Sequence, residues 1–305
     1  LCYSVLHGTE GYAAIMNFWD ELKAYPKVYP RPLLIPPHAI WVIAHRGASK
    51  DAPENTLSAF QLAIEQKADM IELDIRLSRD GQIVVFHDKL LQRTTNGEGR
   101  VDQFSLAELQ QLDAGSWFDP ARYAGEQVPS LRQVLELCTG QIMLNIEIKK
   151  DAVNRSENLI ERRLVGLLEE YDMLPHCMVS SFNTLTLVRL KQLAPRLSTA
   201  LLYGDTVRTN LRPKIPIYGY QAYQMVLRTR ADSLNVRKNL VTRGFLRRSL
   251  ETGVRIHPFT VDEPKLMKKL IRRKVNGIIT NTPDRLIHWL AKEQEKDAAR
   301  QRRRT

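Results

Sequence analysis

Short apolar segments rich in β-branched residues alternate with amphipathic segments along most of the chain. The amphipathic segments have helical periodicity: within residues 56–67, Leu57, Phe60 and Ile64 fall on one face. Strands that alternate with helices form a parallel sheet covered by those helices. The predicted strands are WVIAH (41–45), MIELDIRL (70–77), QIVVFH (82–87), QIMLNIEIK (141–149), CMVSSF (177–182), STALLY (198–203), DSLNV (232–236), VRIHPFTV (254–261) and NGIIT (276–280).

The expected turn between the second and third predicted strands is Asp80-Gly81, with Arg79 facing Gln82, and an Asp-Gly pair between apolar runs is a strong hairpin signal. We therefore expect the third strand to fold back antiparallel. Eight parallel strands remain, which is the number that closes a TIM (β/α)8 barrel. Counting outward from a two-residue turn places Asp74 opposite His87, to within about one residue.

Three segments fall outside this alternation. Residues 1–39 carry five prolines between positions 26 and 37, so we expect an extended N-terminal arm or linker. The segment 89–140 is longer than a usual strand-to-helix loop, so we expect it to form a small inserted lobe with a short helix at 105–112. This lobe is a candidate for substrate recognition. Residues 291–305 form a basic C-terminal tail, which leaves the barrel at 40–290.

The net charge of +11 comes partly from residues 268–274 and 302–304. Such charges are typical of solvated helix faces, but they also suit peripheral contact with an anionic membrane or a phosphorylated substrate. No zinc finger or aromatic-basic motif predicts nucleic-acid binding, and no segment approaches the roughly 20 apolar residues of a membrane span. The three cysteines favour a reducing compartment, so we expect a cytoplasmic protein unless a signal or anchor precedes this sequence. The oligomeric state stays open.

Acidic side chains cluster at the ends of two predicted strands. Glu72 and Asp74 are two residues apart on a strand, so both point to one face, and Glu147 and Lys149 repeat the spacing on the next parallel strand. Carboxylates that lie together repel each other unless a cation lies between them. Three carboxylates suit a hard divalent cation, Mg²⁺ or Ca²⁺. The alternative is that they form only salt bridges with Lys149 and Arg76.

Two histidines end neighbouring strands close to these carboxylates. His45 and His87 could act as an acid/base couple, and Arg46 and Lys149 add positive charge. A metal ion, two positively charged side chains and two histidines in one pocket are typical of enzymes that act on phosphoryl groups. Because the expected register places His87 beside Asp74, we expect His87 to be the base and His45 the acid.

Several separated motifs resemble those of the glycerophosphodiester phosphodiesterases, in order and over about residues 40–290. These motifs are HRG (45–47), PENT (53–56), ELDIRLSRDGQIVVFHD (72–88), RTTNG (93–97), IEIK (146–149), FTVDE (259–263) and VNGIITNTPD (275–284). The resemblance implies a TIM barrel with an inserted lobe that hydrolyses glycerophosphodiesters to glycerol 3-phosphate and an alcohol. It implies the following roles: catalytic histidines His45 and His87, a phosphate ligand Arg46, Lys149 close to the phosphate, and metal ligands Glu72, Asp74 and Glu147.

The chain departs from this family pattern at two positions that bear on substrate preference. Phe259 replaces a frequent tryptophan and would keep an apolar wall against the glycerol, while Asn281 replaces a frequent aspartate and removes a charge from the rim. One alternative is a lysophospholipase D acting on lysophospholipids, and another is a phospholipase-C-like enzyme that releases a cyclic phosphate. A third is a catalytically silent barrel that binds a partner or a membrane. The sequence also leaves open whether water or the glycerol hydroxyl is the nucleophile.

Overall fold

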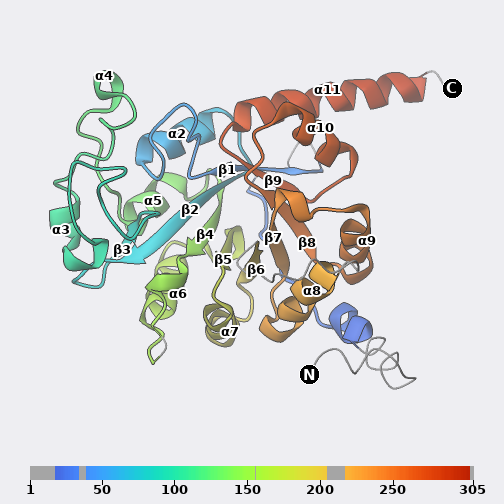
Figure 1. Ribbon diagram of the computed structural model, residues 1–305, viewed down its shortest axis with the longest axis horizontal. Helices are drawn as coiled ribbons and strands as arrows, with labels where there is room; N and C mark the ends of the chain where they lie inside the picture. Colours follow the sequence, from blue (N-terminus) through green and yellow to red (C-terminus); the bar gives the residue numbers. More distant parts are fainter. Residues whose placement is uncertain (1–17, 34–38, 155, 205–216, 303–305) are drawn as a thin grey trace.

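The computed structural model describes residues 18–33, 39–154, 156–204 and 217–302, so parts of the expected arm and tail lie outside the described residues (Figure 1). Its centre is a barrel of eight parallel strands in the order β8-β7-β6-β5-β4-β2-β1-β9. Backbone hydrogen bonds from Asn276 N to Ile256 O (3.2 Å) and from Val261 N to Ile279 O (2.9 Å) join β8 to β9. The predicted TIM barrel is therefore confirmed. The strands are β1 (Trp41–His45), β2 (Met70–Leu77), β4 (Met143–Ile148), β5 (Cys177–Ser181), β6 (Ser198–Tyr203), β7 (Ser233–Arg237), β8 (Arg255–Phe259) and β9 (Gly277–Thr280).

The antiparallel strand β3 (Ile83–Val85) extends β2 as expected, but the predicted register is wrong by one residue. Ile75 faces Val85, because the connecting loop has three residues. Ser78 N donates to Gln82 O at 3.0 Å, and Gly81 closes the loop in the left-handed conformation at φ +73°. As a result Phe86, the residue before His87, pairs with Asp74.

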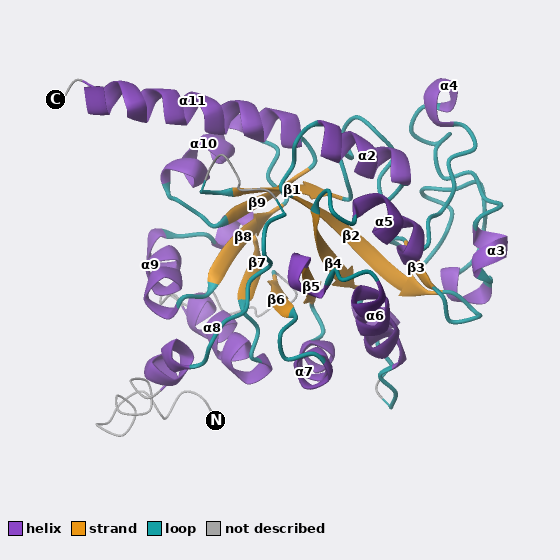
Figure 2. Cartoon of the chain, turned by 180° about the vertical axis from the view of Figure 1, so that it is seen from behind, coloured by secondary structure: helices purple, strands orange, loops and turns teal. Residues whose placement is uncertain are grey.

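Helices surround the barrel on its outer face (Figure 2). Their apolar faces pack on the strands, and α2 is the helix predicted within residues 56–67. The helices are α2 (Leu57–Glu65), α5 (Leu131–Cys138), α6 (Leu159–Glu170), α7 (Thr184–Leu193), α8 (Ile217–Thr229), α9 (Arg243–Thr252), α10 (Pro264–Arg272) and α11 (Pro283–Arg302).

The segment between β3 and α5 forms a small lobe beside the barrel (Figure 1). It contains the 3-10 turn η1 (Val101–Gln103) and the short helices α3 (Leu106–Leu109), where the sequence predicts one, and α4 (Pro120–Tyr123). Its own apolar core includes residues of β3 and of the lobe, namely Val84, Phe86, Leu91, Val101, Leu109, Ala114 and Val128. The lobe is therefore packed against the hairpin that extends β2.

The described part of the N-terminal arm, residues 18–33, covers the end of the barrel where the strands begin. Tyr25 Oη donates to Ala231 O at 2.5 Å, and Val28 N donates to Asp232 Oδ1 at 2.8 Å, both just before β7. Tyr29 packs on the side chains inside the barrel. The arm thus closes one end of the barrel, while the other end stays available for a site.

At the C-terminus, residues 291–302 continue α11 as helix. None of the helices in the described ranges combines the length and the apolar character that a membrane crossing requires.

Candidate active site

Three carboxylates meet where β2 and β4 end, at the mouth of the barrel. The parallel register places Asp74 beside Glu147, and Glu72 precedes them on the same face of β2. All three are buried, with exposed fractions of 5% for Glu72, 1% for Asp74 and 7% for Glu147. Each offers an oxygen that lies within 4.8 Å of the other two. This spacing would allow one cation to contact all three.

The electrostatics of the cluster also suit a cation. Burial, followed by the charges of Asp74 and Glu147, raises the pKa of Glu72 well above its ordinary value. Burial, followed by the charge of Asp74, raises the pKa of Glu147 to about 7. Burial also disfavours the ionised form of Asp74, but Lys149 and Arg46 outweigh it and lower the pKa of that carboxyl. Lys149 and Arg46 therefore stabilise the ionised form of Asp74, whereas the ionised forms of Glu72 and Glu147 remain disfavoured.

Lys149 and Arg46 contact the carboxylates from two sides. Lys149 Nζ lies 2.7 Å from Glu147 Oε1 and 3.2 Å from Asp74 Oδ1, and Arg46 Nε lies 3.2 Å from Asp74 Oδ2. The salt bridges to Lys149 thus form, whereas Arg76 points elsewhere and pairs with Asp151 at 2.9 Å.

The sharp turn after β1 brings Arg46 to this position. Arg46 has a φ of 57°, an unusual conformation for a residue with a side chain, and its N–H donates to Glu72 Oε2 at 3.1 Å. Gly47 follows at φ 84°, where a Cβ would lie 2.6 Å from the Ala59 carbonyl oxygen. Only glycine fits there, because the start of α2 lies against the turn. The HRG motif is thus a tight turn that aims a guanidinium at the carboxylates.

His45 ends β1 and is held by the turn after β9. Its Nδ1 lies 2.7 Å from Asn281 Oδ1, and its Nε2 lies 3.9 Å from Glu72 Oε2. Asn281 Nδ2 donates to Asp262 Oδ2 at 2.7 Å, so the amide oxygen faces the histidine and assigns the proton to Nδ1. The lone pair of Nε2 then faces the carboxylates. Burial, followed by the charge of Arg46, lowers the pKa of His45 to about 4, so the ring is neutral near pH 7.

His87 follows β3 and has a different partner. Its Nδ1 lies 2.5 Å from Asp88 Oδ1, and Asp88 Oδ2 accepts from Arg93 Nε at 2.5 Å. Arg93 also donates to Glu54, which in turn accepts from Arg46 Nη1 at 2.7 Å. Burial lowers the pKa of His87, while Asp74 and Asp88 oppose that shift.

The sequence predicts no part in the site for Asp88, Arg93, Glu54 or Asn55, although all four stand in the quoted motifs. Asn55 has a φ of 59° and exchanges two hydrogen bonds with Asp74, through Nδ2 to Oδ2 at 2.9 Å and from the backbone N of Asp74 to Oδ1 at 3.3 Å. The PENT motif therefore holds both Asp74, through Asn55, and Arg46, through Glu54. A motif match was the only available signal for these roles.

Phe259 ends β8, across the mouth from the hairpin. Its ring meets that of Phe182 edge-on, with the ring centres 6.3 Å apart. The two rings, from the ends of β5 and β8, form an apolar pair at this end of the barrel.

The chain is similar in sequence to known phosphodiesterases. The model of the glycerophosphoryl diester phosphodiesterase family matches residues 45–285. A glycerophosphodiester phosphodiesterase of Caldanaerobacter subterraneus is 39% identical over 252 residues, covering 82% of this chain and 98% of that protein. A putative glycerophosphodiester phosphodiesterase of Bacillus subtilis is 38% identical, covering 81% of this chain and 97% of that protein.

Among solved structures, a phosphodiesterase of Oleispira antarctica in complex with the product sn-glycerol-3-phosphate is similar, with a TM-score of 0.72 and 29% identity. That match covers 82% of this chain and 96% of the other. A glycerophosphodiester phosphodiesterase of Agrobacterium tumefaciens is also 29% identical, with a TM-score of 0.67, over 81% of this chain and 98% of the other. The chain therefore belongs to the glycerophosphoryl diester phosphodiesterase family.

Proposed function

We propose that this phosphodiesterase hydrolyses glycerophosphodiesters to sn-glycerol 3-phosphate and an alcohol. The observation that carries the proposal is the meeting of three buried carboxylates, two cations and two histidines at one end of the barrel. The names of the relatives and the product bound to the Oleispira antarctica phosphodiesterase support the substrate class.

Glu72, Asp74 and Glu147 would hold a divalent cation, and their hard oxygen ligands suit Mg²⁺ or Ca²⁺. When bound, such an ion supplies positive charge that polarises a phosphoryl group. Arg46 and Lys149 border the same cluster, so they are placed to bind the remaining phosphate oxygens. The raised pKa of Glu147 supports a metal site here, because a bound cation would stabilise the ionised form that burial and the neighbouring carboxylates disfavour.

The contacts of the two histidines favour roles opposite to those expected from the hairpin register. His45 is neutral and turns its Nε2 lone pair to the carboxylate cluster, so it is suited to accept the proton of the nucleophile. His87 has a carboxylate at Nδ1, which stabilises the protonated ring, so it is suited to donate a proton to the leaving alkoxide. We therefore assign His45 as the base and His87 as the acid.

Turnover of a panel of esters would test this function. Purified protein is incubated with the glycerol, choline and ethanolamine esters of sn-glycerol 3-phosphate, with Mg²⁺ or Ca²⁺ and after chelation. We expect sn-glycerol 3-phosphate to form only with metal, and activity to return when metal is restored. A transient cyclic phosphate would identify the glycerol hydroxyl as the nucleophile. A lack of turnover of every ester with both metals would refute the proposal and favour a catalytically silent barrel.

One surface supports the alternative of a lipid-borne substrate. A groove of about 570 Å³ between α9 and α10 is lined by basic residues, and Leu250 beside them is 81% exposed. Cations around an exposed leucine suit an anionic membrane. The lining residues are Arg243, Leu246, Arg247, Leu250, Lys269, Arg272 and Arg273. Release of choline from lysophosphatidylcholine in anionic vesicles, faster than from glycerophosphocholine and slowed by Leu250→Asp, would favour a lysophospholipase D.

A further inference from the structure

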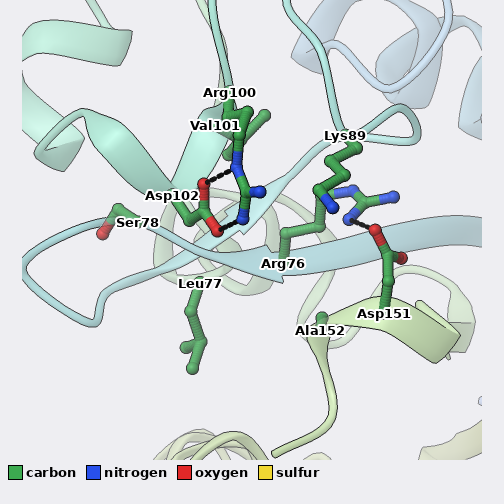
Figure 3. A pocket seen from close by; sticks show the side chains of 9 residues that line it. All are labelled: Arg76, Leu77, Ser78, Lys89, Arg100, Val101, Asp102, Asp151 and Ala152. Atoms are coloured by element: carbon green, nitrogen blue, oxygen red, sulfur yellow. Dashed lines mark hydrogen bonds and ion pairs between the residues drawn. The ribbon is translucent and has the colours of Figure 1, made fainter.

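A cavity lies beside the lobe, a few residues beyond the carboxylates along the segments of β2 and β4. Its volume is about 210 Å³, which is enough for an alcohol the size of glycerol or a cyclitol. The walls come from the end of β2, the first residues of the lobe, the turn η1 and the 3-10 turn η2 (Lys150–Ala152) (Figure 3). The lining residues are Arg76, Leu77, Ser78, Lys89, Arg100, Val101, Asp102, Asp151 and Ala152.

Three of the walls continue segments that carry an active-site residue. Arg76, Lys89 and Asp151 each stand two positions after a residue of the site, namely Asp74, His87 and Lys149. Two residues of extended strand span roughly 7 Å, so Arg76 begins that far beyond Asp74 on the same face of β2. The distance from a bound phosphate to the hydroxyl groups of its ester alcohol is of the same order. The cavity is thus placed where the leaving alcohol of a diester would extend.

The walls are held in place before any substrate arrives. Arg76 is only 8% exposed, and its Nε and Nη2 donate to the carbonyl oxygen of His87 at 3.0 and 2.8 Å. Its Nη1 donates to Asp151 Oδ2 at 2.9 Å. Across the cavity Arg100 pairs with Asp102, and Val101 N donates to Lys89 O at 3.1 Å, which ties the two lobe segments together (Figure 3). One buried guanidinium therefore fixes both the cavity wall and the backbone of a catalytic histidine.

The cavity presents donors and acceptors together. Lys89 is exposed and lines the cavity together with Asp102 and Asp151. Arg100, with a smaller effect of Lys89, lowers the pKa of Asp102. Burial raises the pKa of Asp151, but Arg76, with a smaller effect of Lys89, outweighs it and lowers that pKa. A polyol pairs well with such a surface, since each hydroxyl both donates and accepts. A quaternary ammonium prefers aromatic faces, and none of the nine described lining residues is aromatic. An acyl chain would in turn leave these charges desolvated and unpaired.

We propose that this cavity is the leaving-group subsite and that it selects diesters of polyhydroxylated alcohols, with Lys89 and Arg100 as specificity residues. The inference rests on the proposed function and adds the class of head group. It also assigns the lobe a defined part in recognition, since Lys89 and Arg100 both belong to it.

The test compares kcat/KM for four esters of sn-glycerol 3-phosphate, with glycerol, inositol, choline and methanol as the leaving alcohols. Wild-type protein should prefer glycerol and inositol over choline. Lys89→Ala and Arg100→Ala should each lower kcat/KM for the two polyol esters by about tenfold, mainly through KM, because each removes a charged hydrogen-bond donor. The loss on the methyl ester should be several-fold smaller. Arg122→Ala, an exposed lobe cation on α4 outside the cavity, serves as the control and should match wild type on all four.

Equal losses on all four esters, or wild-type preference for choline, would overturn the subsite assignment while leaving the proposed function intact. A wild-type protein that hydrolyses none of the four esters with metal present would overturn the proposed function and the subsite with it. Because Lys89 is exposed and Arg100 is partly exposed, both variants should fold, and a thermal melt checks that they do.

Discussion

Replacing Glu147 with glutamine should stabilise the protein once divalent metal has been stripped from it. Glu147 is buried among other carboxylates, and its pKa rises from an ordinary 4.5 to about 7. Near pH 8, ionisation of Glu147 therefore lowers the free energy of unfolding by up to about 3 kcal/mol, at about 1.4 kcal/mol for each pKa unit. Glutamine has nearly the same shape and no charge, so Glu147→Gln should recover much of that free energy.

The sign of the effect depends on pH. Below about pH 4.5 the carboxyl is protonated in both the folded and unfolded chains, so the wild type and Glu147→Gln should be equally stable at this position. As the pH rises from 4.5 to 7, the unfolded chain releases this proton before the folded chain does. The wild type thus loses stability over that interval relative to the variant, and the difference levels off above pH 7.

Urea unfolding at pH 5 and pH 8, with and without metal, measures this difference. In chelator, the unfolding midpoint of Glu147→Gln should exceed that of wild type at pH 8, and the gap should narrow at pH 5. Added Mg²⁺ or Ca²⁺ should stabilise the wild type far more than the variant, because binding to the native state adds stability. Glu98→Gln, at an exposed lobe position, is the control. A lower midpoint for Glu147→Gln than for wild type at pH 8 in chelator would refute the reasoning.

Three further outcomes follow from the site. Glu72→Ala should lower metal-dependent turnover by orders of magnitude while the far-UV circular dichroism stays that of wild type; full activity would exclude Glu72 as a ligand. His87→Ala should lose about 10²- to 10⁴-fold on glycerophosphocholine but far less on a nitrophenyl ester, whereas His45→Ala should lose activity on both; equal losses would contradict separate roles. Asn281→Asp should raise the pKa of His45 and shift the acidic limb of the kcat/KM profile to higher pH; an unmoved limb would exclude His45 as the base.

The carboxylate cluster could be predicted because it depends on local rules. Residues two apart on a strand share a face, and neighbouring parallel strands end together, so Glu72, Asp74 and Glu147 had to converge once the segments were known to be strands. The eight-stranded barrel followed in the same way from alternating strand and helix patterns.

The hairpin register could not be predicted with the same certainty, because an Asp-Gly pair suits loops of two or three residues. The side chain of Ser78 decides between them. Its Oγ accepts from Gln82 N at 2.9 Å and donates to Asp80 Oδ1 at 2.6 Å, which stabilises the three-residue loop. This shift by one residue places Phe86 opposite Asp74 in the ladder, whereas the expected role of His87 as the base depended on His87 occupying that position.

The two histidines differ in their partners at Nδ1, and those partners lie in loops, whose structure cannot be predicted from strand periodicity. His45 has a neutral amide at Nδ1 from the turn after β9, whereas His87 has a carboxylate, Asp88, that Arg93 of the lobe holds in place. Because Glu54 accepts hydrogen bonds from both Arg93 and Arg46, the lobe also helps to hold the Arg46 guanidinium in place beside Asp74. The strands thus bring the histidines close to the carboxylates, while the loops supply the different partners at Nδ1 on which the proposed assignment of base and acid depends.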